Sequence, residues 1–271
     1  METFFLKGPE GPLFSVYHPA IGQRRTPLGL IYVPPFAEEM NRARRMAALQ
    51  ARRLAELGVG VLLLDPFGTG DSAGEFGDAR WETWREDVKA AMAWVAARTD
   101  GNVGLWGLRL GALLAADVAA QDPGRISRQL LWQPVLSGDR YLTQFLRLRI
   151  AASMDKATDR ESTEDLRARL SEGESIEVAG YELAPALANA LTSLRLQSFM
   201  ERPDVVPSSW LEVSSGEPAA LTPASQQLID KLTQQGRPLV AQAVVGEPFW
   251  TIQETTLAPN LLRSTDDILR T

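Results

Sequence analysis

A tight turn around Arg109 is the segment of this sequence whose spacing could do chemistry. Residues 107–111 read Gly-Leu-Arg-Leu-Gly, the frame of a nucleophile elbow (G-x-S-x-G), in which two glycines let a strand turn sharply into a helix and expose the middle side chain. The middle residue here is arginine, which stays protonated and has no lone pair with which to attack a carbonyl. The pattern therefore predicts a catalytic turn without its nucleophile.

The other groups that hydrolysis would need are scarce. The chain holds one histidine, His18, and no cysteine, so a Ser-His mechanism has one possible base and thiolate chemistry is excluded. His18 ends an early strand at the sheet edge, which favours a surface or turn histidine over a base. Ser72, beside Asp71, is interpreted as a turn residue because no histidine lies near it in sequence. Ser153-x-x-Lys156 has S-x-x-K spacing but no companion motif, and it is discounted.

Carboxylates could take over the chemistry or simply neutralise Arg109. Either Arg109 is a bidentate anchor for a carboxylate, phosphate or acidic sugar, or it forms a salt bridge that fills the site of a lost nucleophile. Both hold if ligand and glutamate share the guanidinium. Glu38 and Glu39 could act as acid and base or hold a metal, or one of them offsets the dipole of the following helix. The glutamates expected around Arg109 are Glu38, Glu39, Glu217 and Glu247.

Strand and helix patterns alternate through the first half of the chain. After an opening hairpin (3–7 and 13–18), apolar runs predict strands at 28–33, 59–64, 103–106 and 128–132, and helical periodicity predicts helices at 39–57, 81–98 and 110–121. This alternation is typical of parallel strands joined by crossover helices, which cover both faces of a sheet.

The second half departs from this alternation. Residues 136–208 are mostly helical with one short strand at 175–183, and the sheet pattern resumes with strands at 210–213 and 239–245 and helices at 223–235 and from 259. The predicted organisation is a core of residues 1–135 and 209–271 with a helical cap, 136–208, over the carboxyl ends of the strands. Such a cap would cover a binding crevice.

Together these features resemble the α/β-hydrolase fold, with a mostly parallel sheet of about eight strands, helices on both faces and an inserted cap. The D-x-x-G-x-G-x-S loop of that fold stands at 65–72. More narrowly, VPPFAEEMNRARRM (33–46), WGLRLGALLA (106–115) and LWQPVLSG (131–138) resemble the family called exosortase A system-associated hydrolase 2. That family is encoded beside exosortase (PEP-CTERM) and exopolysaccharide genes in Gram-negative bacteria. The resemblance implies hydrolysis.

These residues depart from the pattern that the fold implies. The fold places an acid after a late strand and a histidine near the C-terminus; Glu217 could be the acid, but Pro248 or Glu247 replaces the histidine. Pro35, in the loop that often reads His-Gly, has no backbone N–H to donate. We therefore expect a non-hydrolytic or atypical member that binds a small anionic ligand or a partner of the exosortase system. The ligand contacts are expected at Pro35, Phe36, Leu108, Arg109 and Leu110.

Two alternatives stay open. One is an active hydrolase or transferase acting on an acyl, ester or glycosyl bond of an exopolysaccharide precursor, with glutamates and water in place of the triad. The other is a structural or regulatory partner in an export or polymer-assembly complex, which predicts an occluded crevice and an exposed apolar patch.

Composition narrows the function classes. Apolar residues make up 45% and charged residues 23%, the balance of an ordinary globular protein, and the net charge of −6 argues against general nucleic-acid binding. No apolar run approaches the roughly 18 residues of a membrane span, and the first residues lack a secretory signal. A cytoplasmic protein without a cofactor or metal is the simplest expectation.

Overall fold

Eight strands form the central sheet of the computed structural model, which describes residues 1–153, 161–252, 254 and 256–270. The strand order is β1-β2-β4-β3-β5-β6-β9-β10. β1 and β2 pair antiparallel, β2 pairs antiparallel with β4, and the other neighbours are parallel. The strands are β1 (Glu2–Lys7), β2 (Pro12–His18), β3 (Leu28–Val33), β4 (Val59–Leu64), β5 (Val103–Leu108), β6 (Arg128–Trp132), β9 (Ser208–Ser214) and β10 (Leu239–Val245).

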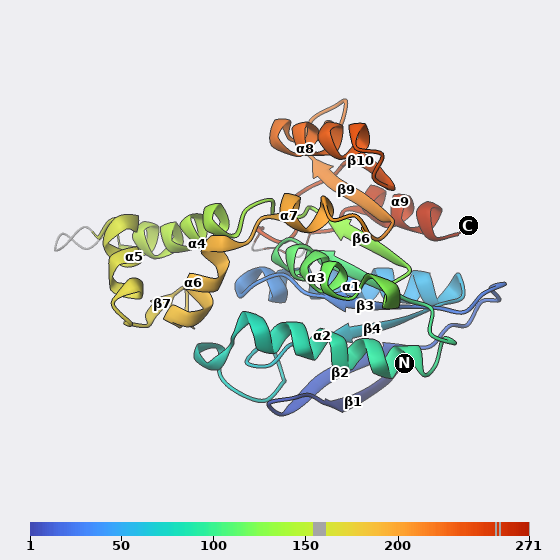
Figure 1. Ribbon diagram of the computed structural model, residues 1–271, viewed down its shortest axis with the longest axis horizontal. Helices are drawn as coiled ribbons and strands as arrows, with labels where there is room; N and C mark the ends of the chain where they lie inside the picture. The colour runs from blue at the N-terminus through green and yellow to red at the C-terminus, as the bar shows by residue number, and fades with distance from the viewer. Residues whose placement is uncertain (154–160, 253, 255, 271) are drawn as a thin grey trace.

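Helices cover both faces of this sheet (Figure 1). One apolar layer includes Met92, Leu113 and Leu232, and a second, on the opposite face, includes Met46 and Leu262. The first layer belongs to α2 (Trp81–Ala96), α3 (Leu110–Gln121) and α8 (Pro223–Gln234), the second to α1 (Glu38–Glu56) and α9 (Pro259–Leu269). Because both faces are covered, all six residues of β3 are buried, which explains its continuous apolar sequence. The predicted mostly parallel sheet is confirmed.

A segment between β6 and β9, called the insertion below, extends beyond the sheet on the side to which the arrowheads of β4 and β6 point (Figure 1). It contains α4 (Gly138–Ser153), α5 (Thr163–Ser171), β7 (Ile176–Val178), β8 (Tyr181–Leu183), α6 (Pro185–Ser193) and α7 (Leu196–Met200). The single strand predicted over 175–183 is wrong, because β7 and β8 form an antiparallel hairpin. Ala179 and Gly180 both have positive φ, which closes a two-residue hairpin turn. Lys156 of the S-x-x-K pattern lies outside the described residues.

The hairpin of the insertion rests on the core near the start of α1. The Tyr181 hydroxyl donates to Glu38 Oε2 at 3.3 Å and accepts from Asn41 Nδ2 at 3.1 Å. Its ring centroid lies 5.0 Å from that of Phe76, in the short 3-10 segment η1 (Phe76–Asp78). These contacts close one side of the space between the insertion and the strand ends.

The histidine does not lie where the sequence predicted. His18 pairs with Val61 of β4 and is 5% exposed. Burial, followed by the nearby N-terminal amine and Arg52, lowers its pKa. The prediction of a surface or turn residue at the sheet edge is therefore wrong. Because β4 and β3 lie between β2 and β5, the two strands are about 14 Å apart at ~4.8 Å per strand.

The loop after β4 is built around Asp65. Asp65 accepts two hydrogen bonds from Arg44 of α1, at 3.2 Å from Nη1 and 2.8 Å from Nη2, and a third from the Asp71 backbone N–H at 3.2 Å. Ser72 Oγ donates to the Asp65 carbonyl oxygen at 2.6 Å and accepts from the Phe14 N–H at 2.8 Å. Ser72 is thus confirmed as a turn residue, and Arg44 ties α1 to this loop.

Candidate ligand-binding site

The turn between β5 and α3 has the strained backbone of an elbow. Arg109 has φ 56° and ψ −119°, a conformation that costs a non-glycine residue about 1–3 kcal/mol and that persists where the surrounding structure enforces it. Its N–H donates to the Trp132 carbonyl oxygen at 3.0 Å, and its carbonyl oxygen accepts from the Val135 N–H at 3.3 Å. Both ends of the turn are thereby attached to β6 and the loop that follows it.

The two elbow glycines are required by close packing. A Cβ on Gly107 would lie 2.4 Å from Ala112 Cα, and one on Gly111 would lie 2.3 Å from the carbonyl oxygens of both Val33 and Pro34. No side chain fits at such distances, because the neighbours are backbone atoms. The strand-turn-helix predicted from the G-x-x-x-G spacing is confirmed, with Arg109 at its tip.

The Arg109 guanidinium is held by one carboxylate and two aromatic rings. Its Nη2 and Nε lie 3.3 Å and 3.4 Å from the same oxygen, Oε1 of Glu39. Its Cζ lies 5.7 Å from the ring centroid of Tyr141 in α4 and 5.5 Å from that of Trp250, within reach of a cation–π attraction. The Arg109 and Glu39 side chains are 18% and 17% exposed, so both are only partly desolvated.

The electrostatics of this cluster leave the arginine incompletely paired. Burial raises the pKa of Glu39, while the Arg109 guanidinium and the Tyr141 hydroxyl oppose that rise. Burial also raises the pKa of Tyr141 well above its usual value, so its hydroxyl stays protonated. Among the described residues, Glu39 Oε2 accepts no hydrogen bond and Arg109 Nη1 donates none. The guanidinium therefore retains N–H donors for another acceptor.

A cavity of about 460 Å³ lies in front of this cluster, between the core and the insertion. The volume is within the range of small-molecule sites, about 300–1,000 Å³. Its walls are largely aromatic and apolar, with two acidic and two basic side chains among them. The lining residues are Phe36, Glu38, Glu39, Arg42, Arg109, Tyr141, Gln144, Phe145, Leu148, Ala179, Trp250 and Thr251.

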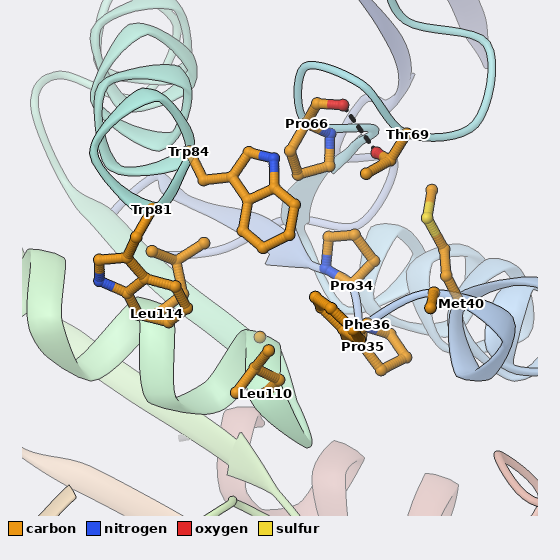
Figure 2. A pocket seen from close by; sticks show the side chains of 12 residues that line it. Pro34, Pro35, Phe36, Met40, Pro66, Thr69, Trp81, Trp84, Leu110 and Leu114 are labelled. Carbon is orange, nitrogen blue, oxygen red and sulfur yellow. Dashed lines mark hydrogen bonds between the residues drawn. The ribbon is translucent and has the colours of Figure 1, made fainter. Parts of the chain in front are cut away.

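A much smaller apolar cavity lies behind the elbow. It holds about 20 Å³, room for about one water molecule. Figure 2 shows Pro34 and Pro35 after β3, Trp84 of α2 and the start of α3 at Leu110 around it. A bound ligand of ordinary size does not fit here, so this cavity is packing space beside the larger one.

The predicted contact residues divide between these places. Arg109 lines the large cavity, Pro35 and Leu110 line the small one, and Phe36 lines both. Leu108 is fully buried in the layer formed by α1 and α9. Side chains alternate along β5, so Leu108 points to the same face as Trp106 and away from the cavity.

The predicted glutamates also divide. Glu39 reaches Arg109, and Glu38 lines the same cavity but is 41% exposed and lies 3.5 Å from Arg42. Glu217 and Glu247 are exposed and line none of the cavities described above, so the expectation that they surround Arg109 is corrected. After β10, Phe249 and Trp250 turn inward, with 1% and 4% exposure, because burying these large apolar side chains is more favourable than burying a charged one.

Several lining residues were missed from the sequence. Tyr141 and Phe145 stand four apart on α4 and therefore on one helix face, a spacing that could have indicated an aromatic wall. Trp250 follows the Pro248 and Glu247 positions considered for the missing histidine. No sequence signal indicated that its ring, and not one of those side chains, would reach Arg109.

Two other classes of site find no support in the described part of the chain. No group of three or more Asp, Glu or His side chains there could hold a metal ion. Within the same residues no helix has the length and apolar character needed to cross a membrane.

The strand order, the strained elbow at the end of β5 and the insertion after β6 define an α/β-hydrolase fold. The family profile described as "Serine aminopeptidase, S33" matches residues 35–200, and the chain belongs to this family. No individually curated protein matches the chain by sequence.

Solved structures with the same fold cover almost the whole chain. GrgF, an α/β hydrolase from Penicillium sp. sh18, has a TM-score of 0.65 at 19% identity, covering 99% of this chain and 97% of its own. Est1E from Butyrivibrio proteoclasticus, with ferulic acid bound, has 0.64 at 15%, covering 98% and 96%. Proline iminopeptidase from Mycobacterium smegmatis has 0.64 at 14%, covering 99% and 97%. At these identities the likeness shows the fold alone.

Proposed function

We propose that this protein binds a small anionic ligand through Arg109 in the crevice under its insertion, which acts as a cap, and that it does not hydrolyse esters by a Ser-His-acid triad. One observation carries the proposal: the tip of the elbow presents a permanently charged guanidinium to a cavity of about 460 Å³ while only one oxygen of Glu39 engages it. Arginine suits carboxylates and phosphates because its N–H donors match two acceptor oxygens at once.

The chemistry that a triad would need is missing around the elbow. Arg109 replaces the nucleophile, and the single imidazole, His18, lies in β2 with two strands between it and β5. Trp250 occupies the side of the cavity where a histidine loop would follow β10. A nucleophile without a base in hydrogen-bond reach is not activated, so the site supports recognition better than covalent catalysis.

The biological setting belongs to the same proposal. The motifs at 33–46, 106–115 and 131–138 resemble exosortase A system-associated hydrolase 2, which favours a ligand or partner from exosortase or exopolysaccharide metabolism. An open cavity does not match the occluded crevice expected of a purely structural partner. A solved structure of Est1E holds ferulic acid, an aromatic carboxylic acid, and this compound is a practical first probe for a guanidinium beside aromatic rings.

Isothermal titration calorimetry with ferulate and with uncharged methyl ferulate tests the proposal. We expect ferulate to bind and methyl ferulate to bind at least about tenfold more weakly, since only the carboxylate pairs with Arg109. Arg109→Gln should abolish the difference between the two probes. Because that variant leaves Glu39 without its cation, the double variant Arg109→Gln/Glu39→Gln serves as a second, charge-balanced form. Arg42→Gln, on the same cavity wall, is the matched control and should keep the preference.

Two results would overturn the proposal. One is equal affinity of folded wild-type protein and both Arg109 variants for ferulate. The other is hydrolysis of methyl ferulate or p-nitrophenyl butyrate at enzyme-like rates that are lost in Arg109→Gln.

A second candidate function rests on the two acids of the cavity. Glu39, whose pKa burial raises, could donate a proton while Glu38, half exposed, activates water, a division of roles known for carboxylate pairs. Only Glu39 is bridged to Arg109. Against this, Oε1 of Glu39 is already engaged and Oε2 is shielded from solvent. Turnover of p-nitrophenyl glycosides or esters that disappears in both Glu39→Gln and Glu38→Gln would favour the enzyme.

A further inference from the structure

A second cavity, with a more polar lining, adjoins the large one at Arg109. It measures about 220 Å³, and Arg109, Tyr141 and Gln144 line both. We call the larger cavity the apolar lobe and the smaller one the polar lobe. A ligand anchored at Arg109 can therefore extend in two directions that differ in chemistry.

The polar lobe carries the stronger attraction for an anion. Besides Arg109 it is lined by Arg140 of α4, an exposed guanidinium that makes no ion pair with any described residue. Its one acid, Glu212, is buried and already accepts from the Trp210 Nε1–H and the Thr222 N–H, both at 3.0 Å. The hydroxyl-bearing residues Ser137, Thr222 and Ser225 also line it, together with Gln133 and the apolar Pro134, Val135 and Leu136.

The apolar lobe is the less favourable place for negative charge. Glu38 and Glu39 line it together with Arg42 and Arg109, so its two basic side chains are matched by two acidic ones. An anion entering this lobe would approach both carboxylates, whereas in the polar lobe it meets two guanidiniums and a carboxylate whose oxygens are both occupied.

The rest of the apolar lobe suits a hydrocarbon or aromatic body. Phe36, Phe145 and Trp250 form its walls, and Leu148 of α4 stands at its rim, 49% exposed. Burying an exposed leucine against a ligand tail is favourable in proportion to the apolar area removed from water. Contact between Leu148 and an apolar ligand body would therefore contribute favourably to the binding free energy.

We infer that the ligand is an anionic amphiphile whose carboxylate or phosphate head lies between Arg109 and Arg140 in the polar lobe while its acyl or aryl body fills the apolar lobe. The inference rests on the proposed function and adds the class of ligand and its orientation. The shared chemistry is an acidic head on an apolar body, whether a fatty acid or a lipid phosphate supplies it.

Calorimetry with matched probes tests this orientation. Octyl phosphate and octanoate should each bind at least about tenfold tighter than inorganic phosphate, acetate and octanol, since tail and head both contribute. The tighter of the two identifies the preferred head. Arg140→Gln should weaken the better probe about fivefold, whereas Arg147→Gln, an exposed arginine on the same helix, should not. Leu148→Gln should weaken binding of the octyl probe and leave that of inorganic phosphate unchanged.

The outcomes separate this inference from the proposed function. If Arg109→Gln abolishes binding while Arg140→Gln and Leu148→Gln do not change it, the amphiphile orientation is wrong and the anion site stands. Equal affinity for octyl phosphate and inorganic phosphate would likewise show that the amphiphile orientation is wrong while the anion site stands. If Arg109→Gln leaves octyl phosphate binding intact, the proposed function fails together with the inference.

Discussion

Two arginine–carboxylate pairs, Arg44–Asp65 and Arg109–Glu39, each use one residue from the first half of α1, and they differ in how completely their hydrogen bonds are satisfied. Asp65 uses both oxygens on Arg44, at 2.8 Å and 3.2 Å, and also accepts the Asp71 N–H. Glu39 offers Arg109 one oxygen, at 3.3 Å and 3.4 Å. The first pair closes a loop, and the second leaves guanidinium donors beside a cavity.

This difference separates a structural arginine from a recognition arginine. In the Arg44–Asp65 pair both carboxylate oxygens accept hydrogen bonds from the guanidinium, and one of them also accepts a backbone N–H. This pair therefore stabilises the chain and has little capacity to bind a ligand. A single-oxygen contact beside open volume can accommodate a ligand without first being broken. Three substitutions at carboxylates, described from the largest expected effect to the smallest, test whether the distinction holds.

The first is Asp65→Ala, which should lower the free energy of unfolding by about 2–3 kcal/mol, because it strands the Arg44 guanidinium and the Asp71 N–H. Urea denaturation measures this. Ferulate affinity at low denaturant should not change, since Asp65 lines neither lobe. Asp71→Ala, at an exposed position in the same loop, is the control and should stay within about 0.5 kcal/mol. A large loss of ferulate affinity in folded Asp65→Ala would contradict the distinction.

The second concerns Asp87 of α2, a buried carboxylate that forms no arginine pair among the described residues. Its Oδ2 accepts the Phe67 N–H at 2.8 Å, and burial raises its pKa from 3.8 to about 6. Since the folded protein then binds the proton more tightly than the unfolded chain, the free energy of unfolding falls as pH rises from about 4 to about 6 and is flat above, by at most about 3 kcal/mol.

Asp87→Asn should remove that fall, because asparagine does not titrate and its Oδ1 can still accept from Phe67. Urea denaturation at several pH values between 4 and 7 checks it, with Glu86→Gln on the exposed side of α2 as the control. A constant difference in stability between wild type and Asp87→Asn across this range would show that Asp87 keeps an ordinary pKa.

The smallest expected effect is at Glu39. Glu39→Gln keeps an oxygen for Arg109 but removes the negative charge that competes with a ligand, so ferulate affinity should rise about threefold to tenfold. Calorimetry measures the change, and Glu38→Gln, whose carboxylate faces Arg42, should alter it less. Weaker binding by Glu39→Gln would mean that the carboxylate orients Arg109 and does not compete with the anion.

The fold could be predicted from the sequence because its signals are local. The buried strands read as continuous apolar runs, as at 28–33, and the elbow glycines mark the turn at Arg109. Prediction was wrong at two places. His18, at the end of β2, pairs with Val61 of β4 and is buried, and two residues with positive φ divide one predicted strand into β7 and β8.

The site could be predicted only in part. Arg109 and Glu39 follow the ends of neighbouring parallel strands, β5 and β3, so their meeting follows from topology. Glu217 and Glu247 follow β9 and β10, which lie two and three strands away from β5. After β10 the side chains of Phe249 and Trp250 are buried, whereas Glu247 is exposed. Tyr141 and Arg140 come from the insertion, whose placement over the strand ends no local pattern specifies.

The contacts that force glycine at 107 and 111 run from backbone to backbone and do not involve the side chain between them. The shape of the turn is thus set independently of the residue that it displays. Replacing that residue changes what the crevice recognises while leaving those backbone contacts, and with them the shape of the turn, in place.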